Sequence, residues 1–271
     1  MQKIKYIINN IDSTFRVARK FILPYAGIRY IIGNYFYKYL FENEADGFRM
    51  LKNKKKLLIA DVGGNDGLFS RFVNSFVSQS HINIFEPIPF HYKKLKSIKS
   101  KDNQFVVHSL ALGFSNQQNF IHIPYVKFLS KKIYLSAYST ISEKETTDFS
   151  QLNHFAGSFY FHKKIKIQSQ PVSIKKLDSF KLSPDILKID VEGFEERVVL
   201  GALQTINNSK SVIYVEQPSD SIDNILKEMG YTKYIFHSES QKFKKVEHNI
   251  EKIYNYYFIH DTSLFNENAF E

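Results

Sequence analysis

Short apolar segments that end in polar or glycine residues alternate with amphipathic segments along most of this chain. Apolar runs of this length, bounded by turn residues, are typical of buried parallel strands. The segments predicted as such strands, with their turns, are residues 56–64, 82–87, 104–113, 184–193 and 211–217. Apolar residues at helical spacing predict helices between them, at residues 67–79, 88–98, 194–206 and 221–231.

This alternation of strand and helix predicts an α/β fold with a doubly wound, Rossmann-like sheet. Two further segments, residues 231–236 and 253–260, are predicted to close the sheet as an antiparallel pair. The main domain is therefore expected to span residues 51–271.

Two parts of the chain depart from this rhythm. Residues 124–163 are rich in Tyr, Ser, Phe and Lys and lie between two predicted extended segments, 119–124 and 163–174. A long irregular insertion in a compact domain is commonly a functional lid, so this one is predicted to be an acceptor cap. Residues 1–50 are predicted to be a basic, aromatic, helical extension that packs on the domain, lies on a membrane surface or mediates dimerisation.

Composition narrows the possible chemistry. The chain has no cysteine, which excludes disulfides, a thiolate nucleophile and Cys-ligated metals. The net charge is +10, and the first 40 residues contain seven basic residues against one acid, Asp12. Such a surface suits nucleic acid, anionic lipid or a phosphorylated substrate, or is a solvated surface without a partner. No secretory signal is evident, so a cytoplasmic location is expected, with contact at the inner membrane face as a further option.

A glycine-rich turn follows the first strand in the stretch DVGGNDGLFS. Gly63, Gly64 and Gly67 crowd the turn between Asp61 and the next helix. Glycines there allow close approach of a ligand, and a helix N-terminus favours anionic groups. Glu86 ends the second strand 19 residues after Gly67, where acids in doubly wound nucleotide sites accept hydrogen bonds from ribose. The same turn also fits an ordinary strand–helix connection.

The stretch ILKIDVEG brings three charges to the end of a buried strand. Lys188, Asp190 and Glu192 arrive at the carboxyl edge of the sheet, where doubly wound proteins bind their ligands. Charged groups rarely lie in a core without partners, so these are expected to pair with one another and to line a polar cleft.

The ordered motifs DVGGNDGLFS, FEP, HSLALG, LKIDVEGFE, VLGA and VEQ resemble the FkbM family of S-adenosylmethionine-dependent methyltransferases. They cover about residues 55–217. Two positions differ from the usual pattern, since Gly64 stands where the family has alanine and Gly113–Phe114 replaces an aspartate after the third strand.

The resemblance implies a seven-stranded, mostly parallel class I methyltransferase sheet with an antiparallel terminal hairpin. It also implies S-adenosylmethionine bound beside the glycine turn and the ends of the second and third strands. The cofactor-binding residues implied in this way are Asp61, Gly63, Asn65, Gly67, Glu86, Pro87, Ser109 and Ala111.

Methyl transfer to a hydroxyl needs a group that accepts the departing proton. The candidates are Asp190 and Glu192, with Glu216 at the end of the fifth strand as a third. Lys188 is expected to keep a carboxylate ionised, to orient the acceptor or to form a structural ion pair. The three acids alternatively form a Mg²⁺ site, since oxygen ligands suit this ion.

The preferred function is O-methylation of a sugar hydroxyl in surface polysaccharide or glycolipid biosynthesis, with an acceptor carried on a lipid or diphosphate as one form. The alternatives are methylation of another small molecule or of nucleic acid, and a non-catalytic binding protein. A nucleic-acid substrate is disfavoured because D-V-E-G replaces an amine-methylating motif after the fourth strand. The sequence leaves a homo-oligomer open.

Overall fold

The structure is a computed structural model. It describes residues 43–52, 54–128, 131–134, 136, 139–141, 166–250, 253–260 and 264–271. The extension predicted at residues 1–50 therefore falls mostly outside the described residues, as does most of the predicted cap. Among the described residues, none of the helices is long and apolar enough to cross a membrane.

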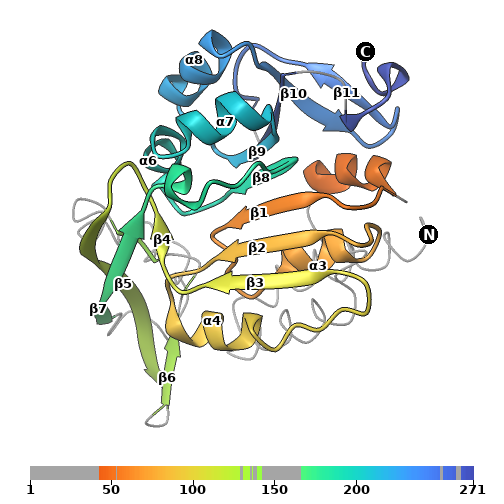
Figure 1. Ribbon diagram of the computed structural model, residues 1–271. Helices are drawn as coiled ribbons and strands as arrows, with labels where there is room; N and C mark the ends of the chain where they lie inside the picture. The colour runs from red at the N-terminus through yellow and green to blue at the C-terminus, as the bar shows by residue number, and fades with distance from the viewer. Residues whose placement is uncertain are drawn as a thin grey trace.

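A mixed sheet of eight strands forms the centre of the protein, in the order β11-β10-β12-β9-β8-β1-β2-β3 (Figure 1). Five strands run parallel, and β12 is antiparallel to both of its neighbours. The parallel strands are β1 (Leu58–Val62), β2 (His81–Phe85), β3 (Gln104–His108), β8 (Ile186–Ile189) and β9 (Val212–Glu216). The others are β10 (Thr232–His237), β11 (Lys242–Lys245) and β12 (Asn255–Ile259).

The expected large α/β sheet is confirmed, and so is the antiparallel pairing of its last predicted strands, β10 with β12. The predicted number of seven strands is wrong for this sheet. The additional strand is β11, which pairs with β10 at the edge. Its sequence KFKK buries only Phe243, so it lacks the apolar run by which the other strands were predicted.

Helices cover both faces of the sheet. On one face, η1 (Asn43–Leu51), α3 (Leu68–Asn74) and α4 (Pro89–Leu95) pack on a core that includes Phe48, Phe72 and Tyr214. On the other face lie η4 (Leu177–Phe180), α6 (Glu195–Leu200), α7 (Leu203–Ser209) and α8 (Asp220–Glu228). A short 3-10 helix, η6 (Glu267–Ala269), ends the chain.

The single helix predicted at residues 194–206 is two helices, α6 and α7, which separate at Gly201 and Ala202. Gly201 lies against the backbone of Gly113, where an added Cβ would be 1.9 Å from the carbonyl oxygen. The close approach of these two chain segments explains why a glycine stands there, and α6 ends at it.

A second, four-stranded sheet lies beside the carboxyl ends of β1, β2 and β3 (Figure 1). Its order is β4-β7-β5-β6, with bounds β4 (Ala111–Leu112), β5 (Gln117–Phe128), β6 (Lys131–Tyr134) and β7 (Lys166–Lys175). The predicted extended segments 119–124 and 163–174 are thus β5 and β7, paired antiparallel. Its buried side chains, including Ile121, Ile123 and Ile174, join the core beneath α6.

Candidate active site

The glycine turn after β1 is fastened to the neighbouring strand. Gly63 and Gly64 both donate backbone hydrogen bonds to the Phe85 carbonyl oxygen, at 3.0 and 3.2 Å. Gly63 (φ 77°), Asn65 (φ 46°) and Gly67 (φ 83°) all have left-handed backbone conformations. Such conformations are costly for residues with a side chain, so two of the three positions are glycine.

Asp61 lies beneath this turn and is fully buried. Its Oδ2 accepts a hydrogen bond from Ser70 Oγ at 2.6 Å, and its Oδ1 lies 3.4 Å from Lys188 Nζ. The longer contact is an ion pair and not a hydrogen bond, because Oδ1 has no hydrogen-bond partner among the described residues. Both contacts join Asp61 to neighbouring elements, so the carboxylate holds the turn in place from below.

Lys188 is the centre of this buried polar group and is only 4% exposed. Its Nζ donates to the Gly63 carbonyl oxygen at 2.9 Å and lies 3.1 Å from Asp190 Oδ2. Burial alone would lower the pKa of Lys188, but the negative charges of Asp190 and Asp61 outweigh it and raise the pKa above its ordinary value. Lys188 therefore stays charged and connects the glycine turn to Asp190. The expected pairing of Lys188 with Asp190 is confirmed, and the second partner is Asp61, which was not expected.

Glu86 extends from the end of β2 toward the same turn and is buried. Its two carboxylate oxygens accept hydrogen bonds from the backbone N–H groups of Asn65, at 2.7 Å, and Ile88, at 2.8 Å. Burial raises the pKa of Glu86 to about 7, although these two hydrogen bonds oppose the rise. A carboxylate has about four acceptor positions, so further hydroxyl donors can still bind it.

The remaining predicted cofactor residues lie around the ends of β2 and β3. Glu86 N–H donates to the His108 carbonyl oxygen at 3.0 Å, which places these strand ends side by side. Pro87 is half-buried, Ser109 is exposed and Ala111 is buried in β4. The structure thus brings the predicted residues to one edge of the sheet, and their contacts with a cofactor stay predictions.

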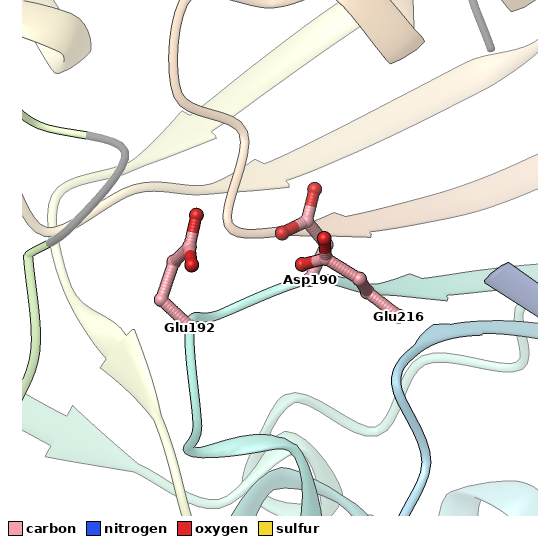
Figure 2. Close-up of side chains that lie close together, drawn as sticks. All are labelled: Asp190, Glu192 and Glu216. Atoms are coloured by element: carbon pink, nitrogen blue, oxygen red, sulfur yellow. The ribbon is translucent and has the colours of Figure 1, made fainter. Parts of the chain in front are cut away.

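Three carboxylates gather at the carboxyl ends of β8 and β9 (Figure 2). Asp190, Glu192 and Glu216 each offer an oxygen, and these oxygens lie within 4.8 Å of one another. The strand β8 ends at Ile189, so Asp190 is the first residue after it, and Glu192 (φ 54°) occupies the following turn. The predicted acid candidates are therefore brought together.

Asp190 differs from its neighbours because Lys188 lies beside it. Its side chain is 39% exposed and so reaches the site edge. Burial alone would raise the pKa of Asp190, but the positive charge of Lys188 and a hydrogen bond with Glu216 keep it below its ordinary value. Asp190 is therefore ionised near neutral pH.

Two residues of the site were not anticipated. Ser70, on the first turn of α3, is the hydrogen-bond partner of Asp61, and the spacing DVGGNDGLFS was the available signal. Glu195 accepts hydrogen bonds from the N–H groups of Val191, at 2.9 Å, and Gly193, at 3.2 Å. It thereby fixes the turn that carries Glu192.

Comparison with known proteins identifies the family of the chain. The methyltransferase FkbM domain matches residues 61–235. No curated protein matches the chain. The methyltransferase FkbM from Methylobacillus flagellatus KT is similar in structure, with a TM-score of 0.43 and 13% identity, covering 82% of this chain and 47% of that one.

The chain thus spans about half the length of the Methylobacillus protein, 47% of it. Precorrin-6y C5,15-methyltransferase from Geobacter metallireducens GS-15 is also similar, with a TM-score of 0.36 and 12% identity, over 80% of this chain and 84% of that one. The family match covers residues 61–235, well over half of the 271 residues, and the chain belongs to the FkbM methyltransferase family.

Proposed function

We propose that this protein is an S-adenosylmethionine-dependent O-methyltransferase that methylates a sugar hydroxyl, in surface polysaccharide or glycolipid biosynthesis. One observation carries the proposal. A single edge of the sheet joins a glycine turn and a buried acid, Glu86, to three gathered carboxylates, and Lys188 connects the two halves. The first half suits a nucleoside cofactor and the second suits a hydroxyl acceptor.

The residues present fit the cofactor. Glu86 is the proposed acceptor of hydrogen bonds from ribose hydroxyls, because it ends β2 beside the glycine turn and its Oε2 already accepts from the Asn65 N–H in that turn. Pro87, Ser109 and Ala111 are the residues expected at the adenine. When bound, S-adenosylmethionine supplies a methyl group on a sulfonium, which is already activated for displacement.

The protein then has to align the acceptor and to take its proton. A sugar hydroxyl is a weak nucleophile until its proton leaves, and a positioned carboxylate increases the rate by accepting that proton. Asp190 is the best candidate for this base, because Lys188 keeps it ionised and its side chain is partly exposed. Glu192 and Glu216 lie close enough to hold other hydroxyls of the same acceptor.

A divalent metal at Asp190, Glu192 and Glu216 is the second form of the proposal. Three carboxylate oxygens are the chemistry that Mg²⁺ prefers. Against it, the Lys188 ammonium lies 3.1 Å from Asp190 and already neutralises part of the negative charge. We therefore give the metal-free base priority, and magnesium titration of metal-stripped enzyme decides between them.

The negative charge of the three carboxylates restricts which acceptors can bind beside them. Three acids repel a phosphate at the point of reaction, which disfavours a nucleic-acid backbone there. A sugar on a lipid or diphosphate carrier remains compatible if the reacting hydroxyl is remote from the phosphates. The proposal also includes a cytoplasmic location. Peripheral membrane contact or oligomerisation would be mediated by the N-terminal extension, of which residues 1–42 lie outside the described residues.

Calorimetric binding of S-adenosylhomocysteine to the full chain, with NAD as control ligand, tests the cofactor assignment. We expect binding of S-adenosylhomocysteine alone, and a thermal shift that grows with its concentration. Transfer of labelled methyl from S-adenosylmethionine to a panel of sugars then tests the acceptor. Absence of cofactor binding, with and without Mg²⁺, would favour the non-catalytic binding protein instead.

A further inference from the structure

His91 is a buried histidine whose ring has no hydrogen bond. It lies on α4, is 5% exposed, and neither Nδ1 nor Nε2 has a partner among the described residues. Buried polar atoms are almost always paired, because an unpaired one forfeits the hydrogen bonds that it makes in water. A bound ligand would supply the partners that both ring nitrogens lack among the described residues.

The position of His91 indicates which ligand. The helix α4 starts at Pro89, three residues after Glu86, which follows the end of β2. Leu95 lies one turn further along the same helix face and fills the space beside the glycine turn. An added Cβ would come within 3.4 Å of Leu95 at Gly64 and 2.8 Å at Gly67.

Since α4 runs from the carboxyl edge of the sheet toward the amino edge, His91 is nearer to the carboxyl edge than Leu95. That edge is where Glu86 and the glycine turn meet. The side chain is thus on the helix face that packs toward the turn, at the end of the helix where a ligand would lie. Its ring also packs on Phe90, with 4.4 Å between ring centroids, and Phe90 stacks on Tyr134 of β6 at 5.0 Å.

The ring is suited to bind a neutral, polar partner. Burial, assisted by the charge of Lys94, lowers the pKa of His91 to about 4. The imidazole is therefore neutral at physiological pH and offers one N–H donor and one acceptor nitrogen. Adenosine presents both kinds of group, through the amino group and ring nitrogens of adenine and the hydroxyls of ribose.

We infer that His91 hydrogen-bonds the adenosine part of the cofactor and is a further binding residue of this site. The inference rests on the proposed function. It accounts for the unpaired ring, because the cofactor supplies the partners that the described residues do not. Binding of adenosine, which lacks the amino-acid part of the cofactor, should therefore depend on His91 as much as binding of S-adenosylhomocysteine does.

His260 provides a matched control. Its Nδ1 is also buried and has no hydrogen-bond partner among the described residues, and its ring packs against Tyr231. It follows β12, whose last residue, Ile259, pairs with the first residue of β10, Thr232. That places His260 at the amino edge of the sheet, opposite the glycine turn, where the cofactor does not reach.

The experiment is calorimetric titration of the full chain with S-adenosylhomocysteine and with adenosine. We expect His91→Leu to weaken both ligands by about tenfold, the size of one hydrogen bond. His91→Asn, which keeps a donor and an acceptor, should lose less, and His260→Leu should bind both ligands as the wild type does. Thermal unfolding without ligand should show His91→Leu to be as stable as the wild type or more so, because an unpaired polar group is removed.

Unchanged affinity of His91→Leu for both ligands, in a wild type that binds them, would overturn the role of His91 and leave the proposed function standing. Equal losses in His91→Leu and His260→Leu would also overturn it, since they would indicate a general structural effect. A wild type that binds neither ligand would refute the proposed function itself. If His91→Leu does not fold, His91→Phe and His91→Asn provide the same comparison.

Discussion

Lys188 Nζ lies 3.1 Å from Asp190 Oδ2 and 3.4 Å from Asp61 Oδ1. One buried ammonium therefore forms ion pairs with a carboxylate at the site edge and with another in the core. Removing such a cation leaves the fully buried Asp61 without its counter-charge. We expect Lys188→Met to lower the free energy of unfolding by roughly 3–5 kcal/mol, the usual cost of breaking a buried pair.

Chemical denaturation of a double-mutant cycle measures this interaction. Lys188→Met combined with Asp61→Asn removes both charges and should recover part of the stability lost by Lys188→Met alone. Strictly additive losses would show that Lys188 and Asp61 do not interact and would contradict the ion pair as described.

The burial of Glu86 predicts a particular pH dependence of stability. Its pKa is raised from 4.5 to about 7 in the folded protein, so the folded state binds this proton more tightly than the unfolded state does. The associated stability is present below about pH 4.5 and is lost as the pH rises through about 7. Linkage sets the size of this loss at roughly 3 kcal/mol.

Glu86→Gln, which cannot ionise, is the reference for that measurement. The stability of the variant minus that of the wild type should increase between pH 4.5 and 7 and level off above. A constant difference over this range would show that Glu86 ionises normally. The affinity of the wild type for S-adenosylhomocysteine should rise over the pH range in which its stability falls, because ribose hydroxyls donate to the ionised form of Glu86.

Several elements of this arrangement were predictable because one physical rule determined each. Apolar runs ending in an acid predicted β1, β2, β8 and β9, and their parallel course places Asp61, Glu86, Asp190 and Glu216 at one edge. The glycine positions predicted the turn after β1, where φ is 77° at Gly63 and 83° at Gly67.

What the sequence did not predict depends on contacts between distant segments. The break between α6 and α7 follows from the approach of Gly201 to Gly113, 88 positions earlier in the chain by their numbers. The second sheet pairs β5 with β7, which are far apart in the chain, and no local pattern specifies that register. His91 belongs to no motif, and its significance is visible only from its burial and its unpaired ring.

Mutation of the individual acids should distinguish the roles of Asp190, Glu192 and Glu216. We expect Asp190→Asn to lower kcat by about 10²–10⁴-fold, the contribution of a general base, with little change in affinity for S-adenosylhomocysteine. Glu192→Gln and Glu216→Gln should mainly raise the KM for the acceptor. Asp220→Asn, at an exposed acid that begins α8, is the matched control and should leave turnover unchanged. Full turnover in both Asp190→Asn and Glu192→Gln would exclude a carboxylate base at these positions.

Gly63 and Gly230 allow backbone strain to be distinguished from damage to the site. Both have left-handed backbones, with φ of 77° and 88°, so alanine at either position should cost about 1–2 kcal/mol from strain alone. At Gly230 an added Cβ would approach only the His260 ring, at 3.1 Å. At Gly63 it would be 1.8 Å from the Asp190 carbonyl oxygen, so the end of β8 must move. We therefore expect Gly63→Ala to lose more stability than Gly230→Ala in chemical denaturation, and to be the only one of the two that weakens S-adenosylhomocysteine binding. Equal stability losses with unchanged affinity in both variants would mean that the close contact between the glycine turn and Asp190 does not shape the site.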